Sequence, residues 1–96
     1  MAKTLTNETT YEVYLEDEEG RGYTGRITGQ LIASDETSRG VLDVYLTDDE
    51  RVLLHDDGKC SVLELENPAD ELRENLSPGV YAVAMHALGE RPVVDL

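Results

Sequence analysis

Acidic side chains are the largest group of residues in this chain that could carry chemistry. The 96 residues include 21 Asp and Glu against 8 Lys and Arg, a formal net charge of -13 at pH 7. The densest acidic clusters are Glu16, Asp17, Glu18 and Glu19; Asp48, Asp49 and Glu50; and Asp56 and Asp57. Grouped carboxylates can hold divalent cations, imitate a row of phosphates or face a basic protein. Direct binding of nucleic acid or anionic lipid is not expected, because such affinity depends on Lys and Arg.

Metal-binding patterns do not fit the spacing of these residues. An EF-hand loop needs oxygen ligands at alternating positions around a central Gly, with a terminal Glu. Aligning Gly58 with that Gly places Leu53, which has no ligand atom, at the first position. Zinc needs several His or Cys ligands, and the whole inventory is His55, His86 and Cys60. We therefore expect no metal and no other cofactor.

A catalytic nucleophile is the other chemistry to test. Cys60 lies between Lys59 and an apolar run, so we expect a small, buried or half-buried strand residue. A nucleophilic thiol needs a base beside it. His55 could approach Cys60 across a hairpin, although no spacing in the sequence requires this. We expect a protein that is not an enzyme, and an enzyme built on Cys60 or His55 is the minor alternative.

Short segments rich in apolar residues, which alternate with polar ones in the first, third and fifth, predict β-strands. They are Tyr11–Glu16, Tyr23–Ala33, Val41–Thr47, Arg51–His55 and Lys59–Glu66. Gly25 and Gly29 in the second segment indicate a bulge or a close backbone approach. Asp57-Gly58 is typical of a two-residue type I′ hairpin turn. Short connections between consecutive strands predict an antiparallel meander.

The turns of such a meander determine where the acids lie. Alternate turns of a meander fall at the same end of the sheet. The turns at residues 17–22 and 48–50 would then share one end. The loops at residues 34–40 and 56–58 would share the other.

The last third of the chain carries helix signals. Asn67-Pro68 and Ser77-Pro78 are start signals, because Asn or Ser can cap free N–H groups and Pro is tolerated at the first position. The apolar stripes are Ala69, Leu72 and Leu76, then Val80, Val83, Ala84, Ala87 and Leu88. Gly89 ends the second helix, and Val93–Leu96 is expected to be extended. The sequence predicts an α+β fold: a meander sheet of about five antiparallel strands with a C-terminal pair of short helices packed on one face.

The length predicts one domain. We expect residues 1–10 to form a flexible N-terminal leader and residues 11–96 to form a single α+β domain. No stretch approaches the roughly 18 apolar residues that span a bilayer. The first ten residues lack the apolar region of a signal peptide. We therefore expect a cytoplasmic protein that does not bind membranes.

Several short stretches occur in the order found in one family of small actinobacterial proteins. They are Tyr23-Thr24-Gly25-Arg26, Leu31-Ile32-Ala33, Val44-Tyr45-Leu46-Thr47, Arg51-Val52, Asp70-Glu71-Leu72-Arg73, Leu76-Ser77-Pro78, Val80-Tyr81-Ala82 and Pro92-Val93-Val94-Asp95-Leu96. Over residues 22–96 the chain resembles the EXLDI family, named for a C-terminal Glu-x-Leu-Asp-Ile signature. Pro92 and Val94 stand here in the Glu and Leu places. The family has no established activity, so the resemblance implies only a small, cytoplasmic, non-enzymatic domain.

The acid excess and the lack of a catalytic set predict a non-enzymatic interaction or accessory protein. It would engage a basic protein partner or form a homodimer through a sheet edge. One alternative is a nucleic-acid mimic that sequesters a DNA- or RNA-binding protein, which requires acids on one continuous face. A further alternative is a salt-adapted domain whose charge has no binding role. Arg outnumbers Lys six to two, which suits a halophile or a GC-rich genome.

Overall fold

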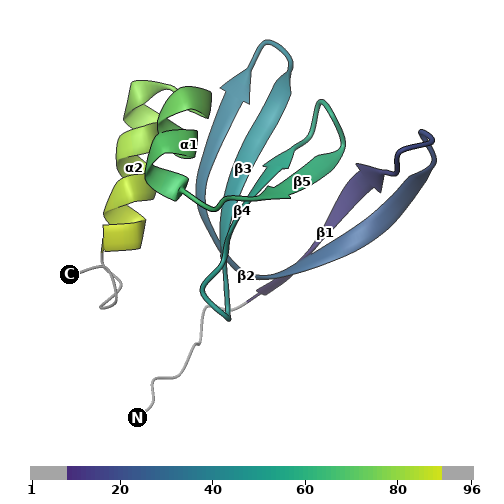
Figure 1. Ribbon diagram of the computed structural model, residues 1–96, viewed down its shortest axis with the longest axis horizontal. Helices are drawn as coiled ribbons and strands as arrows, with labels where there is room; N and C mark the ends of the chain where they lie inside the picture. Colours follow the sequence, from purple (N-terminus) through teal and green to yellow (C-terminus); the bar gives the residue numbers. More distant parts are fainter. Residues whose placement is uncertain (1–8, 90–96) are drawn as a thin grey trace.

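Five antiparallel strands followed by two helices make up residues 9–89, the part of the chain that the computed structural model describes (Figure 1). The elements are β1 (Thr9–Glu16), β2 (Gly22–Thr37), β3 (Gly40–Thr47), β4 (Val52–Asp56), β5 (Ser61–Glu64), α1 (Pro68–Asn75) and α2 (Pro78–Gly89). The strands are ordered in the sheet as they are in the chain. The predicted α+β class and the antiparallel meander are confirmed. The expected extended segment Val93–Leu96 and most of the expected leader lie outside the described residues.

β2 shapes the sheet, because its two halves pair with different strands. Its first half pairs with β1 and its second half with β3, and Gly29 belongs to both pairings. A Cβ at Gly29 would clash with the carbonyl oxygen of Leu46 on β3, which explains the glycine. The register shifts between Leu31 and Ala33. A bulge of this kind bends a strand and increases its twist, so the sheet curls.

The second predicted strand is too short, and the predicted polar loop at residues 34–40 is wrong. Residues 34–37 continue β2 and pair with residues 40–43 of β3. Their polar side chains find partners inside the fold. Ser34 donates a hydrogen bond to Asp43 on β3 at 2.6 Å. The buried Asp35 accepts one from the backbone N–H of Ser77 at 2.8 Å. Residues 34–37 therefore form a paired strand, although their polar composition predicts a loop.

Two clusters of buried residues lie on opposite faces of β3 and β4. The larger consists of Ala33, Val44, Leu46, Val52, Leu54, Leu65, Leu72, Leu76 and Ala84. The smaller consists of Val13, Ile27, Tyr45 and Leu53, with Tyr11, Leu15 and Val62 packed against it. Strand alternation explains the division, since successive side chains point to opposite faces. Helix residues join only the larger cluster, whereas Val13 and Ile27 of the curled β1–β2 hairpin join only the smaller one.

The helices begin where the sequence indicates, but their packing differs in two places. The side chain of Asn67 makes no capping hydrogen bond to the helix N-terminus. Instead the Glu71 carboxylate accepts a hydrogen bond from the Asn67 backbone N–H at 2.8 Å. Val83, expected in the apolar stripe of α2, is 56% exposed. α2 has no acidic residue and His86 is its one basic residue, so apolar residues lie all around the helix and their spacing does not identify the packed face.

The turn between β4 and β5 is also different from the prediction. It has four residues, 57–60, so the two-residue type I′ turn is wrong. Cys60 is a half-buried turn residue with a φ of 54°, not a strand residue. Gly58 is needed because a Cβ would clash with the carbonyl oxygen of Arg39. The N–H of Asp57 also donates to the carbonyl oxygen of Val41 at 2.9 Å. The β4–β5 turn therefore packs against the β2–β3 hairpin.

Candidate interaction surface

The two edge strands of the sheet, β1 and β5, meet at one point. The backbone N–H of Glu16, at the end of β1, donates to the carbonyl oxygen of Cys60 at 2.8 Å. β5 begins at the next residue, Ser61. Beyond this contact β1 and β5 diverge, and no ladder pairs them within residues 9–89 (Figure 1). The curled sheet is thus joined to itself at a single corner.

This corner brings two acidic clusters together. Burial raises the pKa of the Cys60 thiol, and the negative charges of Glu16, Asp57 and Asp56 raise it further. Charges act on a titrating group in this way when they lie close to it. Glu16 belongs to the first acidic cluster and the two aspartates to the third. We call Glu16, Glu18, Asp56 and Asp57, with Cys60 between them, the junction surface.

One of the two expected pairs of turns is confirmed and the other is wrong. The loops at residues 34–40 and 56–58 lie at the same end of the sheet, since the N–H of Asp57 donates to the carbonyl oxygen of Val41. The turns at residues 17–22 and 48–50 do not share an end. The β1–β2 turn, which holds Asp17, Glu18 and Glu19, lies at the corner of the β4–β5 turn. The β3–β4 turn, with Asp48, Asp49 and Glu50, lies at the lower end of the sheet in Figure 1, away from both. The reason is the 16-residue length of β2, which pairs with β1 and β3 along different halves and curls between them.

Some of the predicted site residues build turns. In the β1–β2 turn the Asp17 carboxylate accepts hydrogen bonds from the backbone N–H groups of Glu19 and Arg21, both at 2.9 Å. These bonds lower the pKa of Asp17, that from Arg21 most. The Arg21 guanidinium also pairs with Asp17 at 2.9 Å and with Glu19 at 3.1 Å. Asp17 and Glu19 are therefore engaged within their own turn.

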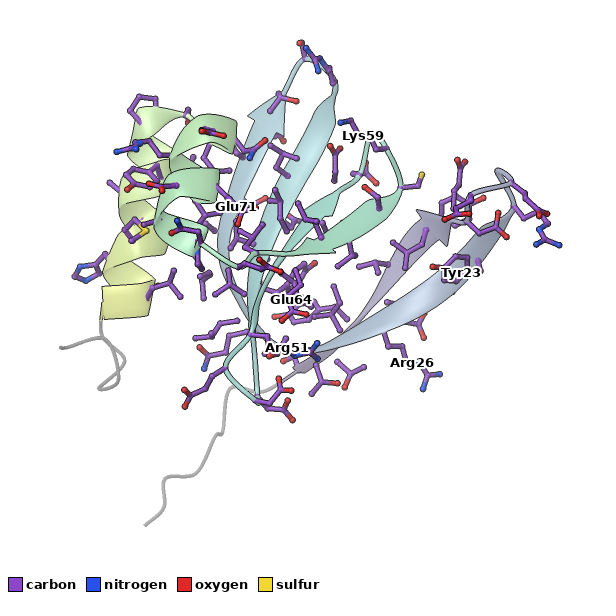
Figure 2. All side chains as sticks on the ribbon, viewed as in Figure 1. Tyr23, Arg26, Arg51, Lys59, Glu64 and Glu71 are labelled. Carbon is purple, nitrogen blue, oxygen red and sulfur yellow. The ribbon has the colours of Figure 1, made fainter. Side chains whose placement is uncertain are left out.

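The β3–β4 turn is built in a similar way. The hydroxyl of Thr47 donates to the Asp49 carboxylate, and this bond, followed by that from Arg51, lowers the pKa of Asp49. Arg51 pairs with Asp49 at 3.1 Å and with Glu64 on β5 at 3.4 Å (Figure 2). Asp48 is exposed beside this network. The second acidic cluster therefore stabilises a turn and ties it to β5.

The exposed acids of the junction surface differ from Asp17 and Asp49, because they are not bonded within a turn. The carboxylates of Glu16, Glu18 and Asp57 accept no hydrogen bond and form no ion pair with residues 9–89. Asp56 accepts a hydrogen bond from the backbone N–H of Lys59 at 3.2 Å. Exposed carboxylates without a partner in the fold are available to a cationic partner.

Cys60 and His55 do not form a nucleophile and base pair. The Cys60 thiol donates to the carbonyl oxygen of Asp57 at 3.7 Å. Both ring nitrogens of the buried His55 lack a hydrogen-bond partner within the described residues. The cross-strand neighbours of His55 are Asp43 and Val62. A reactive thiol has a lowered pKa, and the pKa of Cys60 is raised. His55 is best explained as a residue of the fold.

A cleft of about 460 Å³ lies near the junction surface, and no pattern in the sequence indicates it. It is formed where the β2–β3 hairpin, the β4–β5 turn and the end of α1 meet. Its lining includes two basic residues, Arg39 and Lys59, and two acidic residues, Asp56 and Glu74. Charges of both signs line this cleft, so it does not select one class of ion.

Some kinds of site are missing from the described residues. No group of three or more His, Cys, Asp or Glu within residues 9–89 is arranged to hold a metal ion. Neither helix in that range is long and apolar enough to cross a membrane. No family model, curated protein or solved structure matches this chain at a significant level, and the resemblance to the EXLDI family stays a prediction.

Proposed function

We propose that this protein is a small, non-enzymatic interaction or accessory protein that engages a basic protein partner through the junction surface. The observation that supports this most is the 2.8 Å hydrogen bond from the Glu16 N–H to the Cys60 carbonyl oxygen, which brings Glu16 close to Asp56 and Asp57. These acids lie at the ends of β1 and β4 and in the β4–β5 turn, far apart in the chain, and the β1–β5 contact holds them together. A cationic protein face is the partner chemistry that such a surface favours.

A nucleic-acid mimic is less well supported. It requires carboxylates in one continuous array, whereas the β3–β4 turn lies away from the junction surface (Figure 1). Asp17 and Asp49 are also engaged by Arg21 and Arg51 within their own turns. We therefore favour a local acidic docking surface over a long phosphate-like track.

The proposal also includes the face of the sheet that the helices cover and the cellular location of the protein. Leu72 of α1 and Ala84 of α2 are fully buried in the core shared with β3 and β4. We infer that the helix pair covers one face of the sheet and leaves the β1 side available to a partner. The partner and this protein would meet in the cytoplasm.

Affinity capture from lysate tests the proposal when matched charge variants are compared. Glu18→Gln with Asp57→Asn removes two charges from the junction surface, whereas Asp48→Asn with Glu74→Gln removes two elsewhere. We expect wild type and the second variant to retain a basic protein that high salt elutes, and the first variant to lose most of it. Capture that is equal for both variants, or that salt does not affect, contradicts the proposal.

A further inference from the structure

We infer that the partner binds as an extended, basic segment that pairs with the outer edge of β1 and adds a strand to the sheet. This inference rests on the proposed function and names its binding mode. Addition of a strand to an exposed sheet edge is a recurrent way of recognising peptides, because main-chain hydrogen bonds supply affinity and alternate side chains supply specificity.

The direction of one hydrogen bond shows which backbone groups of β1 are available. The N–H of Glu16 points away from β2, since it donates to Cys60. Along an antiparallel strand the backbone groups of every second residue point the same way. The register of β1 with β2 is unbroken, so the N–H and C=O groups of Thr10, Glu12 and Tyr14 also point outward. No strand within residues 9–89 pairs with them.

β1 lacks the devices that usually protect an edge strand. Natural edges are blocked by Lys, by Pro, by a bulge or by being very short. β1 spans eight residues without Lys, Arg or Pro, and it pairs with β2 without a bulge. β5, the other edge, has four residues. The charged side chains of β1 are Glu12 and Glu16, so this edge rejects acidic strands and accepts basic ones.

The two faces of β1 specify an alternating occupant. Tyr11, Val13 and Leu15 point toward the smaller core, where Tyr11 and Leu15 are only partly buried. Side chains of an added strand on that face would be apolar. Glu12 and Glu16 share the other face with Tyr14, which is 54% exposed. On this face we expect Lys or Arg, paired with the acids or stacked on the Tyr14 ring.

Arg26 does not neutralise this edge. It lies opposite Glu12 in the β1–β2 register. No ion pair joins the two side chains among the described residues. In Figure 2 the Arg26 side chain extends away from the strand. Glu12 therefore remains available to a cation from an added strand.

A second copy of the chain fits the edge less well. Antiparallel pairing of two β1 edges centred on Glu12 would place the two Glu12 side chains directly opposite each other. Like charges in opposed positions destabilise a strand pair. The net charge of -13 on each copy adds to this repulsion.

Hydrogen exchange on the full chain, followed by NMR, tests the inference. The probe is a capped peptide of seven residues that alternates Lys and Val, beginning and ending with Lys. When the peptide is bound, we expect the exchange rates of the Thr10, Glu12 and Tyr14 amides to fall by at least about tenfold. A peptide of the same composition with four Lys followed by three Val is the control. It is expected to bind weakly and to leave those amides unprotected.

Variants of Glu12 separate charge from edge pairing. Glu12→Gln removes the charge alone and should weaken peptide binding by a few-fold. Glu12→Pro also removes an outward N–H, which an edge strand tolerates, and should weaken binding by about tenfold or more. Far-UV circular dichroism checks the fold. If Glu12→Pro unfolds, Glu12→Lys replaces it and should bind the corresponding Glu and Val peptide better than the Lys and Val peptide.

Three results overturn the inference. The first is a bound Lys and Val peptide that shifts the resonances of Glu18 and Asp57 without slowing exchange at the β1 edge, which leaves the proposed function intact. The second is equal binding by Glu12→Pro and wild type. The third is concentration-dependent protection of the edge without any peptide, which identifies a second copy as the occupant. If the two double variants of the capture experiment lose the partner equally, the proposed function is overturned instead.

Discussion

The backbone N–H of Glu16 and the carbonyl oxygen of Cys60, 2.8 Å apart, join the end of β1 to the start of β5. This hydrogen bond is the point at which the curled sheet meets itself. It also places the Glu16 carboxylate near the Cys60 thiol. Burial raises the pKa of this thiol, and the charges of Glu16, Asp57 and Asp56 raise it further. Cys60 can therefore report whether the two acidic turns are close together in solution.

The reactivity of Cys60 should depend on the junction acids. Replacing Glu16 by Gln and Asp57 by Asn removes two of the charges that raise the Cys60 pKa, so that pKa should fall. At a fixed, mildly alkaline pH more thiolate is present, and alkylation by iodoacetamide should be faster. The pH dependence of the alkylation rate measures the change. Asp48→Asn is the control and should leave the profile unchanged.

The stability of the protein at high pH should depend on Tyr45. Burial, and then the charges of Asp43 and Tyr11, raise the pKa of Tyr45 from its usual value of 10.0 to about 12. Because the folded state binds the phenol proton more tightly, its contribution to stability is complete below pH 10 and is lost as the pH rises to about 12.

The matched variant for this prediction is Tyr45→Phe, which has no phenol proton to lose. Between pH 10 and 12 the midpoint of urea unfolding should fall less in Tyr45→Phe than in wild type. Phenolate absorbance should show Tyr45 among the last tyrosines to ionise. Equal decreases in the two midpoints would show that the Tyr45 ring is not in the environment described.

Loss of the His55 imidazole should not destabilise the fold. Its ring is buried and both nitrogens lack partners within residues 9–89. An unsatisfied buried polar group costs roughly 1–3 kcal/mol. His55→Leu should therefore be neutral or raise the free energy of unfolding by about 1 kcal/mol. The neighbouring Leu54→Ala should lower it by roughly 2–5 kcal/mol, and a similar loss for His55→Leu would reveal a partner for the imidazole.

Gly29 should be far less tolerant of substitution than Gly79. A Cβ at Gly29 would clash with the carbonyl oxygen of Leu46, whereas nothing lies within 4 Å of a Cβ at Gly79. Gly29→Ala should lower the free energy of unfolding by roughly 1–3 kcal/mol. Gly79→Ala, in a helix, should raise it by about 0.5–1 kcal/mol. Urea titrations of both variants measure the difference, and a harmless Gly29→Ala would contradict the close approach of β2 and β3.

Local signals predicted most of the elements. The alternation of Val13 and Leu15 on β1 and of Val44 and Leu46 on β3 matches the observed faces, because each strand has a buried side. The helices also begin at the expected prolines. The end of β2 could not be predicted, since Ser34 and Asp35 are satisfied by partners that are distant in the sequence.

The candidate site was predicted only as a set of acids. Their grouping depends on the curl of β2 and on the contact between Glu16 and Cys60, which no local pattern contains. Asp17 and Asp49 belong to their own turns. A sheet edge was expected as a contact between two copies, but β1 was not identified as an edge that binds another segment, although Thr9–Glu16 contains no Lys or Pro.

The most direct test of a specific acidic docking surface is calorimetric titration with the alternating Lys and Val peptide at low and high salt. Wild type is compared with Glu18→Gln/Asp57→Asn and with Asp48→Asn/Glu74→Gln, which carry equal net charge. We predict that the first variant binds several-fold more weakly than wild type, that the second binds nearly as well, and that high salt narrows the difference. Equal weakening of both variants would show that only the total charge matters, as in a salt-adapted coat, and would contradict the account.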